Sequence, residues 1–135
     1  MSFALHPRLE ADTHFAADWP LCRALVMNDA RYPWLVLVPR REDVTELAAL
    51  AAADRAQLMD EIARAGLLVQ ALAAVTKLNI GALGNLVPQL HVHVVGRRQG
   101  DPAWPGPVWG HGAAQAYDAA TLKLALAGAR SALGV

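Results

Sequence analysis

The sequence predicts an α+β fold with a mainly antiparallel sheet, and the order of its elements carries that prediction. Short apolar runs rich in branched residues are typical of strands, and they fall into two groups, one before residue 40 and one between residues 78 and 97. A long stretch with helical spacing of apolar residues separates the groups. Grouped strands, unlike strands that alternate singly with helices, favour α+β. The length of 135 residues fits one domain, so we expect residues 1–135 to form a single domain.

The first group contains three candidate strands. Arg23–Met27 and Trp34–Val38 are the stronger candidates, and Thr13–Ala16 is a weaker one. Residues 28–33 contain Asn, Asp and Pro and predict the turn between the two stronger strands. The first dozen residues show no periodicity, and we expect them to be irregular.

The helical part follows this group. Apolar residues recur at helical spacing from Asp54 to Val75, with alanines between them, which predicts a long helix. A short helix is expected before it, with Asp43 or Thr45 as its cap. A final helix is predicted over Ala119–Leu133, capped by Asp118.

The second group contains two strands, Leu78–Ala82 and Leu90–Arg97, which are followed by a loop over Gly100–Gly112. Along Leu90–Arg97 the side chains alternate between the two faces of the sheet. Gln89, His91 and His93 are therefore expected to share one face, and the apolar residues between them the other.

Composition excludes several classes of function. Twelve basic and twelve acidic residues give a net charge of zero, which argues against bulk electrostatic binding to nucleic acid or anionic membrane. Residues 78–96 carry no Asp, Glu, Lys or Arg, but their Asn, Gln, His, Pro and Gly residues argue against a membrane span. The single cysteine, Cys22, is expected to be a buried apolar residue, and a reducing cytoplasmic location fits it best.

The two histidines on one strand face suggest a chemical site, because an imidazole can act near neutral pH as nucleophile, acid or base. Two other interpretations stay open at this point. The histidines could lie on an ordinary solvent-facing strand, or they could bind a metal ion. A metal would need a third ligand, for which the nearest candidates are His111, Asp101 and Asp29.

Several ordered segments together resemble the histidine triad (HIT) family of nucleotide hydrolases and transferases. The family motif is His-x-His-x-His followed by two apolar residues, and residues 89–95 read Gln-x-His-x-His-Val-Val. Upstream, Asn79-Ile80-Gly81 and Gly84-Asn85 resemble the segments that precede the triad in that family. Leu25–Asp29 and Leu35–Arg41 resemble its earlier pair of strands. The resemblance implies five antiparallel strands with two main helices, and a homodimer joined through central helices and edge strands.

The resemblance also implies a function and a set of site residues. His91 would attack the α-phosphorus of a dinucleoside polyphosphate or an AMP conjugate, forming a nucleotidyl-histidine intermediate. His93 would donate a hydrogen bond to the phosphate. Asn79 and Asn85 would also contact the phosphate, and Asn28 or Asp29 would contact the ribose. Arg97, from its place after the histidine strand, would contact the phosphate as well. No cofactor is expected, and a divalent cation would enter only with a polyphosphate substrate.

Two departures from the family pattern lead to an alternative function. Gln89 stands at the first triad position, and Trp34 stands where the family has a histidine before its apolar strand. An amide hydrogen-bonds but does not shuttle protons near pH 7. The alternative is therefore a nucleotide-binding module with little turnover, whose activity a Gln89→His change would restore. Trp34 itself is expected to pack in the core. The tryptophan-containing loop 104–109 is expected to stack on a base, on a partner, or on the body of the protein.

Overall fold

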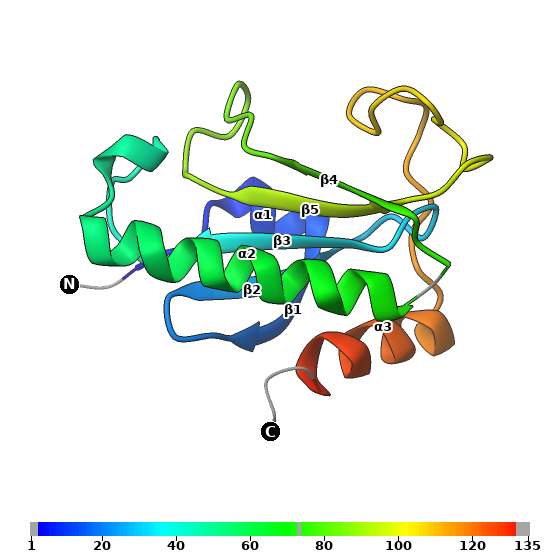
Figure 1. Ribbon diagram of the computed structural model, residues 1–135, viewed down its shortest axis with the longest axis horizontal. Coiled ribbons are helices and arrows are strands. Elements are labelled where there is room, and N and C mark those ends of the chain that lie inside the picture. The colour runs from blue at the N-terminus through cyan, green and yellow to red at the C-terminus, as the bar shows by residue number, and fades with distance from the viewer. Residues whose placement is uncertain (1–2, 73, 132–135) are drawn as a thin grey trace.

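The structure is a computed structural model that describes residues 3–72 and 74–131 (Figure 1). Its centre is a five-stranded sheet in the order β1-β2-β3-β5-β4, in which every neighbouring pair is antiparallel. The strands are β1 (Thr13–Asp18), β2 (Cys22–Met27), β3 (Trp34–Pro39), β4 (Lys77–Gly81) and β5 (Val92–Arg97). The predicted α+β class is confirmed, and each strand lies within two residues of its predicted limits.

Two helices cover one face of this sheet. Helix α2 (Ala52–Leu72) packs on β5 and β3, and α3 (Ala119–Ser131) packs on β1, β2 and the end of α2. The inward side chains of alternating strand positions, among them Val26, Leu37 and Val94, form one apolar core with these helices. All six residues of β3 are buried because both faces of the sheet are covered, which explains its unbroken apolar run.

The opposite face of the sheet carries a second core and leaves room for a site. Trp34, Val36 and Val95 lie on this face, together with Leu9 from α1 (Pro7–Asp12) and Val108 from the loop after β5. The histidine-bearing strand therefore has an apolar back that packs on α2. Its front is partly open.

The N-terminal segment corrects the expectation of an irregular start. Residues 7–12 form α1, with Pro7 in its first turn and the His6 ring accepting a hydrogen bond from the Arg8 backbone N–H at 3.0 Å. Proline fits this position because its fixed backbone angle is helical and it lacks an N–H that would need a partner. Six residues are too few to show a helical period in the sequence.

Other element boundaries can be compared with the predictions in the same way. β5 begins at Val92 instead of Leu90, because the Leu90 N–H bonds to the Val44 carbonyl at 2.9 Å instead of joining the sheet. The short helix is the 3-10 turn η1 (Leu47–Ala49), which has no side-chain cap, so neither Asp43 nor Thr45 caps it. Asp118 does cap α3, accepting from the Thr121 N–H at 2.8 Å, while the predicted end at residues 132–133 lies outside the described residues. No helix in the described ranges is long and apolar enough to cross a membrane.

Candidate active site

A cavity of about 490 Å³ lies on the open face of the sheet, in front of the histidine strand. His93 faces it from β5, opposite Val36 of β3 and Gly81 of β4, and His91 reaches it from the residue just before the strand. The remaining walls come from α1, the end of β2, the β4–β5 loop and the segment after residue 107. The described residues that line it include Asp29, Trp34, Leu83, Gly84, Asn85, His91, His93 and Trp109.

His93 is fixed as a neutral hydrogen-bond donor. The indole Nε1–H of Trp34 donates to His93 Nδ1 at 3.1 Å, so that nitrogen accepts and carries no hydrogen. Burial, with a smaller contribution from His91, lowers the pKa of His93 to about 4. The ring is therefore neutral near pH 7, and its hydrogen lies on Nε2. A neutral imidazole with this tautomer donates one hydrogen bond over a wide range of pH.

His91 has the opposite arrangement of ring nitrogens. Its Nδ1 lies 2.7 Å from the backbone carbonyl oxygen of Gln89. A carbonyl oxygen can only accept, so Nδ1 carries the hydrogen, and Nε2 of the neutral ring holds the free electron pair. The two imidazoles pack edge to face with their centroids 4.9 Å apart. The site thus places a nucleophilic nitrogen beside a fixed donor, which is what attack on a phosphorus atom requires.

The acidic side of the cavity is supplied by Asp29. Its carboxylate accepts hydrogen bonds from the Arg31 guanidinium, including one of 2.8 Å, and from the Arg31 backbone N–H at 3.1 Å. Burial raises the pKa of Asp29, but the hydrogen bonds from Arg31 outweigh burial and lower it. An ionised carboxylate at this place can accept hydrogen bonds from hydroxyl groups of a ligand. The β4–β5 loop contributes Asn85 to the cavity wall, just after Gly84, whose φ of 73° suits glycine.

Comparisons with known proteins show the family of the chain. The family model described as HIT domain matches residues 8–100. The chain belongs to the HIT family. A histidine triad protein from Bradyrhizobium japonicum is 48% identical over 97% of this chain and 98% of its own, with a TM-score of 0.94. One from Marinobacter aquaeolei VT8 is 40% identical over 99% and 98%, with a TM-score of 0.95. No match was found among curated proteins.

A more distant solved structure is similar to this chain in fold alone. The NitFhit protein of C. elegans is 20% identical, with a TM-score of 0.64, and the match covers 88% of this chain and 27% of that chain. Membership of the HIT family supports nucleotide binding with hydrolase or transferase chemistry in general terms. The particular substrate and mechanism are treated below as proposals.

At the first triad position of this HIT chain, the side chain bonds the N-terminal segment. Gln89 lies before β5, and its side-chain amide bonds the N-terminal segment: Oε1 accepts from the His6 N–H at 2.8 Å, and Nε2 donates to the Ala4 carbonyl at 2.9 Å. The expectation that Gln89 shares a strand face with His91 and His93 is therefore wrong. Its backbone carbonyl orients His91, while its side chain holds the segment that leads into α1.

Two predicted phosphate contacts are absent from the cavity wall. Arg97 is 1% exposed, and its guanidinium donates to Asp101 at 2.7 and 2.9 Å and to the Asn79 side-chain oxygen at 2.7 Å. Hydrogen bonds from Arg97 hold the pKa of Asp101 at about 2 despite burial. Arg97 and Asn79 therefore belong to a buried hydrogen-bond network under the loop after β5. Sequence alone gave no sign of it, because an arginine at a strand end is usually solvated.

Asn28 is also used structurally. Its side-chain oxygen accepts from the Tyr117 N–H at 3.0 Å, and the neighbouring Ala30 N–H bonds the Gln115 carbonyl. These contacts fix residues 111–117, here called the C-terminal strap, along the end of β2. Of the two predicted ribose contacts, Asp29 lines the cavity, whereas Asn28 holds the strap.

Sequence reasoning missed most of the cavity wall supplied by residues after the family match. Trp109 packs edge to face on His93 with centroids 5.6 Å apart, and Gly81 provides the space for its ring. Trp104 lies over the Arg97 guanidinium at 5.7 Å. The alternative that the tryptophan loop packs on the body of the protein is therefore confirmed. The only sequence signal was two tryptophans in a short loop.

Proposed function

We propose that the protein is a nucleotide hydrolase or nucleotidyltransferase that works through His91. The observation that carries the proposal is the pair of fixed tautomers. The free Nε2 of His91 attacks the α-phosphorus of a dinucleoside polyphosphate or AMP conjugate, and the leaving group departs with the electrons of the broken bond. Water or another acceptor then displaces His91 and releases the nucleotide.

The surrounding residues support this reaction by binding and orientation. The Nε2–H of His93 donates to a non-bridging phosphate oxygen, and the amide of Asn85 is available as a second donor. Asp29 accepts from the ribose hydroxyls. Because His93 stays neutral, its contribution does not depend on a proton taken up near pH 7.

The test is product formation from a panel of substrates. Wild type and His91→Ala, both treated with chelator, would be incubated with diadenosine tri- and tetraphosphate, adenosine phosphoramidate and AMP esters, and chromatography would measure AMP. His14→Ala on β1 is the matched control. AMP release by wild type and the control, but not by His91→Ala, is the expected result. AMP release by His91→Ala at the wild-type rate would refute the mechanism.

A second function, nucleotide binding with little turnover, is favoured by a specific observation. Neither Gln89 nor Trp34 supplies an imidazole, and both side chains have structural hydrogen bonds. Where a general acid assists a reaction, it contributes roughly 10²–10⁴-fold to the rate. AMP binding without product from any substrate would support this alternative.

We further propose a homodimer in the cytoplasm. Met59 and Leu67, on the face of α2 turned away from the sheet, are 64% and 71% exposed. β4 is an edge strand, and its Ile80 is 49% exposed. An exposed apolar helix face and an open strand edge each suit association of two copies. Light scattering tests this, and a Leu67→Glu variant is expected to be monomeric.

A further inference from the structure

The imidazole of His93 is enclosed by three aromatic rings. Trp34 of β3 and His91 contact it edge to face, with centroid separations of 5.7 and 4.9 Å. The third ring is that of Trp109, at 5.6 Å and an interplanar angle of 68°. His93 is only 5% exposed, although it lines the main cavity. The structure thus leaves little of this ring open to water.

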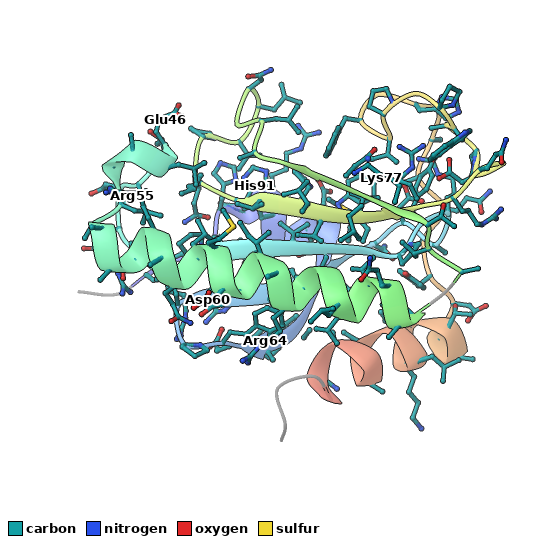
Figure 2. All side chains as sticks on the ribbon, viewed as in Figure 1. Glu46, Arg55, Asp60, Arg64, Lys77 and His91 are labelled. Carbon is teal, nitrogen blue, oxygen red and sulfur yellow. The ribbon has the colours of Figure 1, made fainter. Side chains whose placement is uncertain are left out.

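Trp109 covers His93 from the side opposite to Trp34. β5 lies between β3 and β4, and Gly81 of β4 pairs directly with His93. Figure 2 labels Lys77 at the start of β4, and the loop after β5 rises beside this end of the sheet. A Cβ at position 81 would lie 3.3 Å from Cη2 of the Trp109 indole, which is closer than an ordinary contact. Glycine at this position therefore makes room for the ring.

The loop that carries Trp109 is folded around the buried ion pair of Arg97 and Asp101. The Asp101 carboxylate also accepts a hydrogen bond from the Trp104 N–H at 2.8 Å. Val108, next to Trp109, is 2% exposed and belongs to the second core. These contacts of its own loop hold Trp109 in place beside the site. The loop lies after residue 100, where the match to the family model ends.

The two tryptophans beside His93 are held in different ways. The Nε1–H of Trp34 donates to His93 Nδ1 at 3.1 Å. The Nε1–H of Trp109 is buried and has no hydrogen-bond partner among the residues that the structure describes. A role that depends on a hydrogen bond is lost when phenylalanine replaces tryptophan, whereas a role that depends on the ring survives. Trp34 therefore fixes the tautomer, while Trp109 fills space that water would otherwise take.

We propose that Trp109 is a positioning residue, which keeps water away from His93 so that the ring turns its Nε2–H towards the bound phosphate. The proposal rests on the proposed function, in which that hydrogen bond holds a non-bridging oxygen. Water beside the ring would favour its protonated form, because burial disfavours charge. A proton on Nδ1 would then face the Trp34 N–H, and two donors cannot share a hydrogen bond. Exclusion of water therefore also protects the bond from Trp34.

The charges around His93 stay the same when Trp109 is replaced. His91 contacts the ring. The other titratable groups that line the cavity, among the described residues, are those of Arg8, Asp12, Asp29, Arg31 and His111. The two acids and the two arginines balance in formal charge. Burial is the main cause that lowers the pKa of His93 to about 4, so a change in that pKa reports the access of water.

The first test follows the ¹⁵N and ¹H shifts of the His93 ring between pH 3 and 8. Trp109→Ala is expected to raise the pKa of His93 from about 4 to above about 5.5, towards its ordinary value, and to mix the tautomers. Trp109→Phe should keep the low pKa and the single tautomer. Trp109→Leu should give an intermediate pKa, and it replaces Trp109→Ala if that variant does not fold. Trp104→Ala is the matched control, because Trp104 is the other tryptophan of the loop and lies over Arg97 instead of His93.

The second test measures the binding of adenosine 5′-methylphosphonate by calorimetry. This analogue of AMP carries one negative charge throughout the range used and has no group on phosphorus that leaves easily. At pH 7.5 Trp109→Ala should bind it about fivefold more weakly than wild type, which is the size of one neutral hydrogen bond. Trp109→Phe should bind it like wild type. At pH 5 the defect of Trp109→Ala should shrink, because a protonated His93 attracts the phosphonate.

These measurements separate the positioning role from the proposed function, since neither needs turnover. A pKa of His93 that stays near 4 in folded Trp109→Ala, or that rises as much in Trp104→Ala, would overturn the positioning role and leave catalysis by His91 standing. The same loss in Trp109→Phe as in Trp109→Ala would also overturn it. A raised pKa and weaker binding in Trp109→Ala, with no AMP release by wild type from any substrate, would support the positioning role and overturn the enzyme.

Discussion

Replacing Asp101 by Asn should destabilise the protein strongly at neutral pH and by about 1 kcal/mol less at pH 3. The carboxylate accepts two bonds from the Arg97 guanidinium, and both side chains are almost fully buried, with exposures of 1% and 3%. Removing one partner of such a pair leaves the other charge buried without compensation, which costs about 3–5 kcal/mol. The amide of Asn keeps the shape but carries no charge.

The pH dependence of the free energy of unfolding gives a second, independent magnitude for this ion pair. The pKa of Asp101 is about 2 in the folded protein, against an ordinary value of 3.8. This difference contributes about 2.5 kcal/mol of stability above the ordinary pKa, and the contribution is lost as the pH falls through 4 towards 2. At pH 3 about 1 kcal/mol of it is already lost. The stability gap between wild type and Asp101→Asn should therefore be about 1 kcal/mol smaller at pH 3 than at pH 7.

Urea unfolding followed by circular dichroism at pH 7, 5 and 3 measures this gap. Asp60→Asn is the control, since Asp60 is exposed on α2 and its replacement should change stability by less than about 0.5 kcal/mol. A gap that is the same at pH 7 and pH 3 would show that the ion pair is not the source of the stability. A variant as stable as wild type at pH 7 would refute the whole argument.

Three further predictions concern the site and its support. Trp34→Phe should keep the aromatic packing but release His93 Nδ1, so that ¹⁵N shifts of the ring report mixed tautomers and AMP binds about fivefold more weakly. Unchanged ring shifts would contradict this, and Trp19→Phe on the other face is the control. Gln89→His should not raise activity, because it removes the bonds to the N-terminal segment and lowers the free energy of unfolding by about 1–2 kcal/mol; a gain in kcat would count against this assignment. Gly96→Ala should lower the free energy of unfolding by about 1–3 kcal/mol in a urea titration, since a Cβ there would lie 2.6–2.8 Å from the side chains of α2, residue 75 and Pro33. Wild-type stability for that variant would mean that these side chains move aside easily.

Local patterns in the sequence were enough to predict most of the fold. The unbroken apolar run of β3 and the helical spacing of α2 both reflect burial, which depends on residues close in sequence. α1 was missed because one and a half turns show no period. The start of β5 differs from the prediction because the Leu90 N–H bonds the Val44 carbonyl, and no neighbouring residue predicts that partner.

The site residues also differ in whether local sequence or distant partners determine their roles. His91 and His93 were found because their alternation is local. The roles of Gln89 and Arg97 depend on partners at the N-terminal segment and in the loop after β5, which only the folded chain brings close. The bond from Trp34 to His93 spans 59 residues and depends on the register of β3 against β5. No local pattern carries that register, so the fixed tautomer of His93 was invisible in the sequence.

The C-terminal strap has a consequence for how the protein is made. Its bonds to Asn28 and Asp29 join residues 89 and 86 positions apart, and the Gln89 bond to His6 spans 83. During synthesis the five strands and both histidines leave the ribosome before residues 111–117. A nascent chain therefore carries His91 and His93 before the wall of the candidate cavity is complete, and the cavity takes its full shape only after residues 111–117 have left the ribosome.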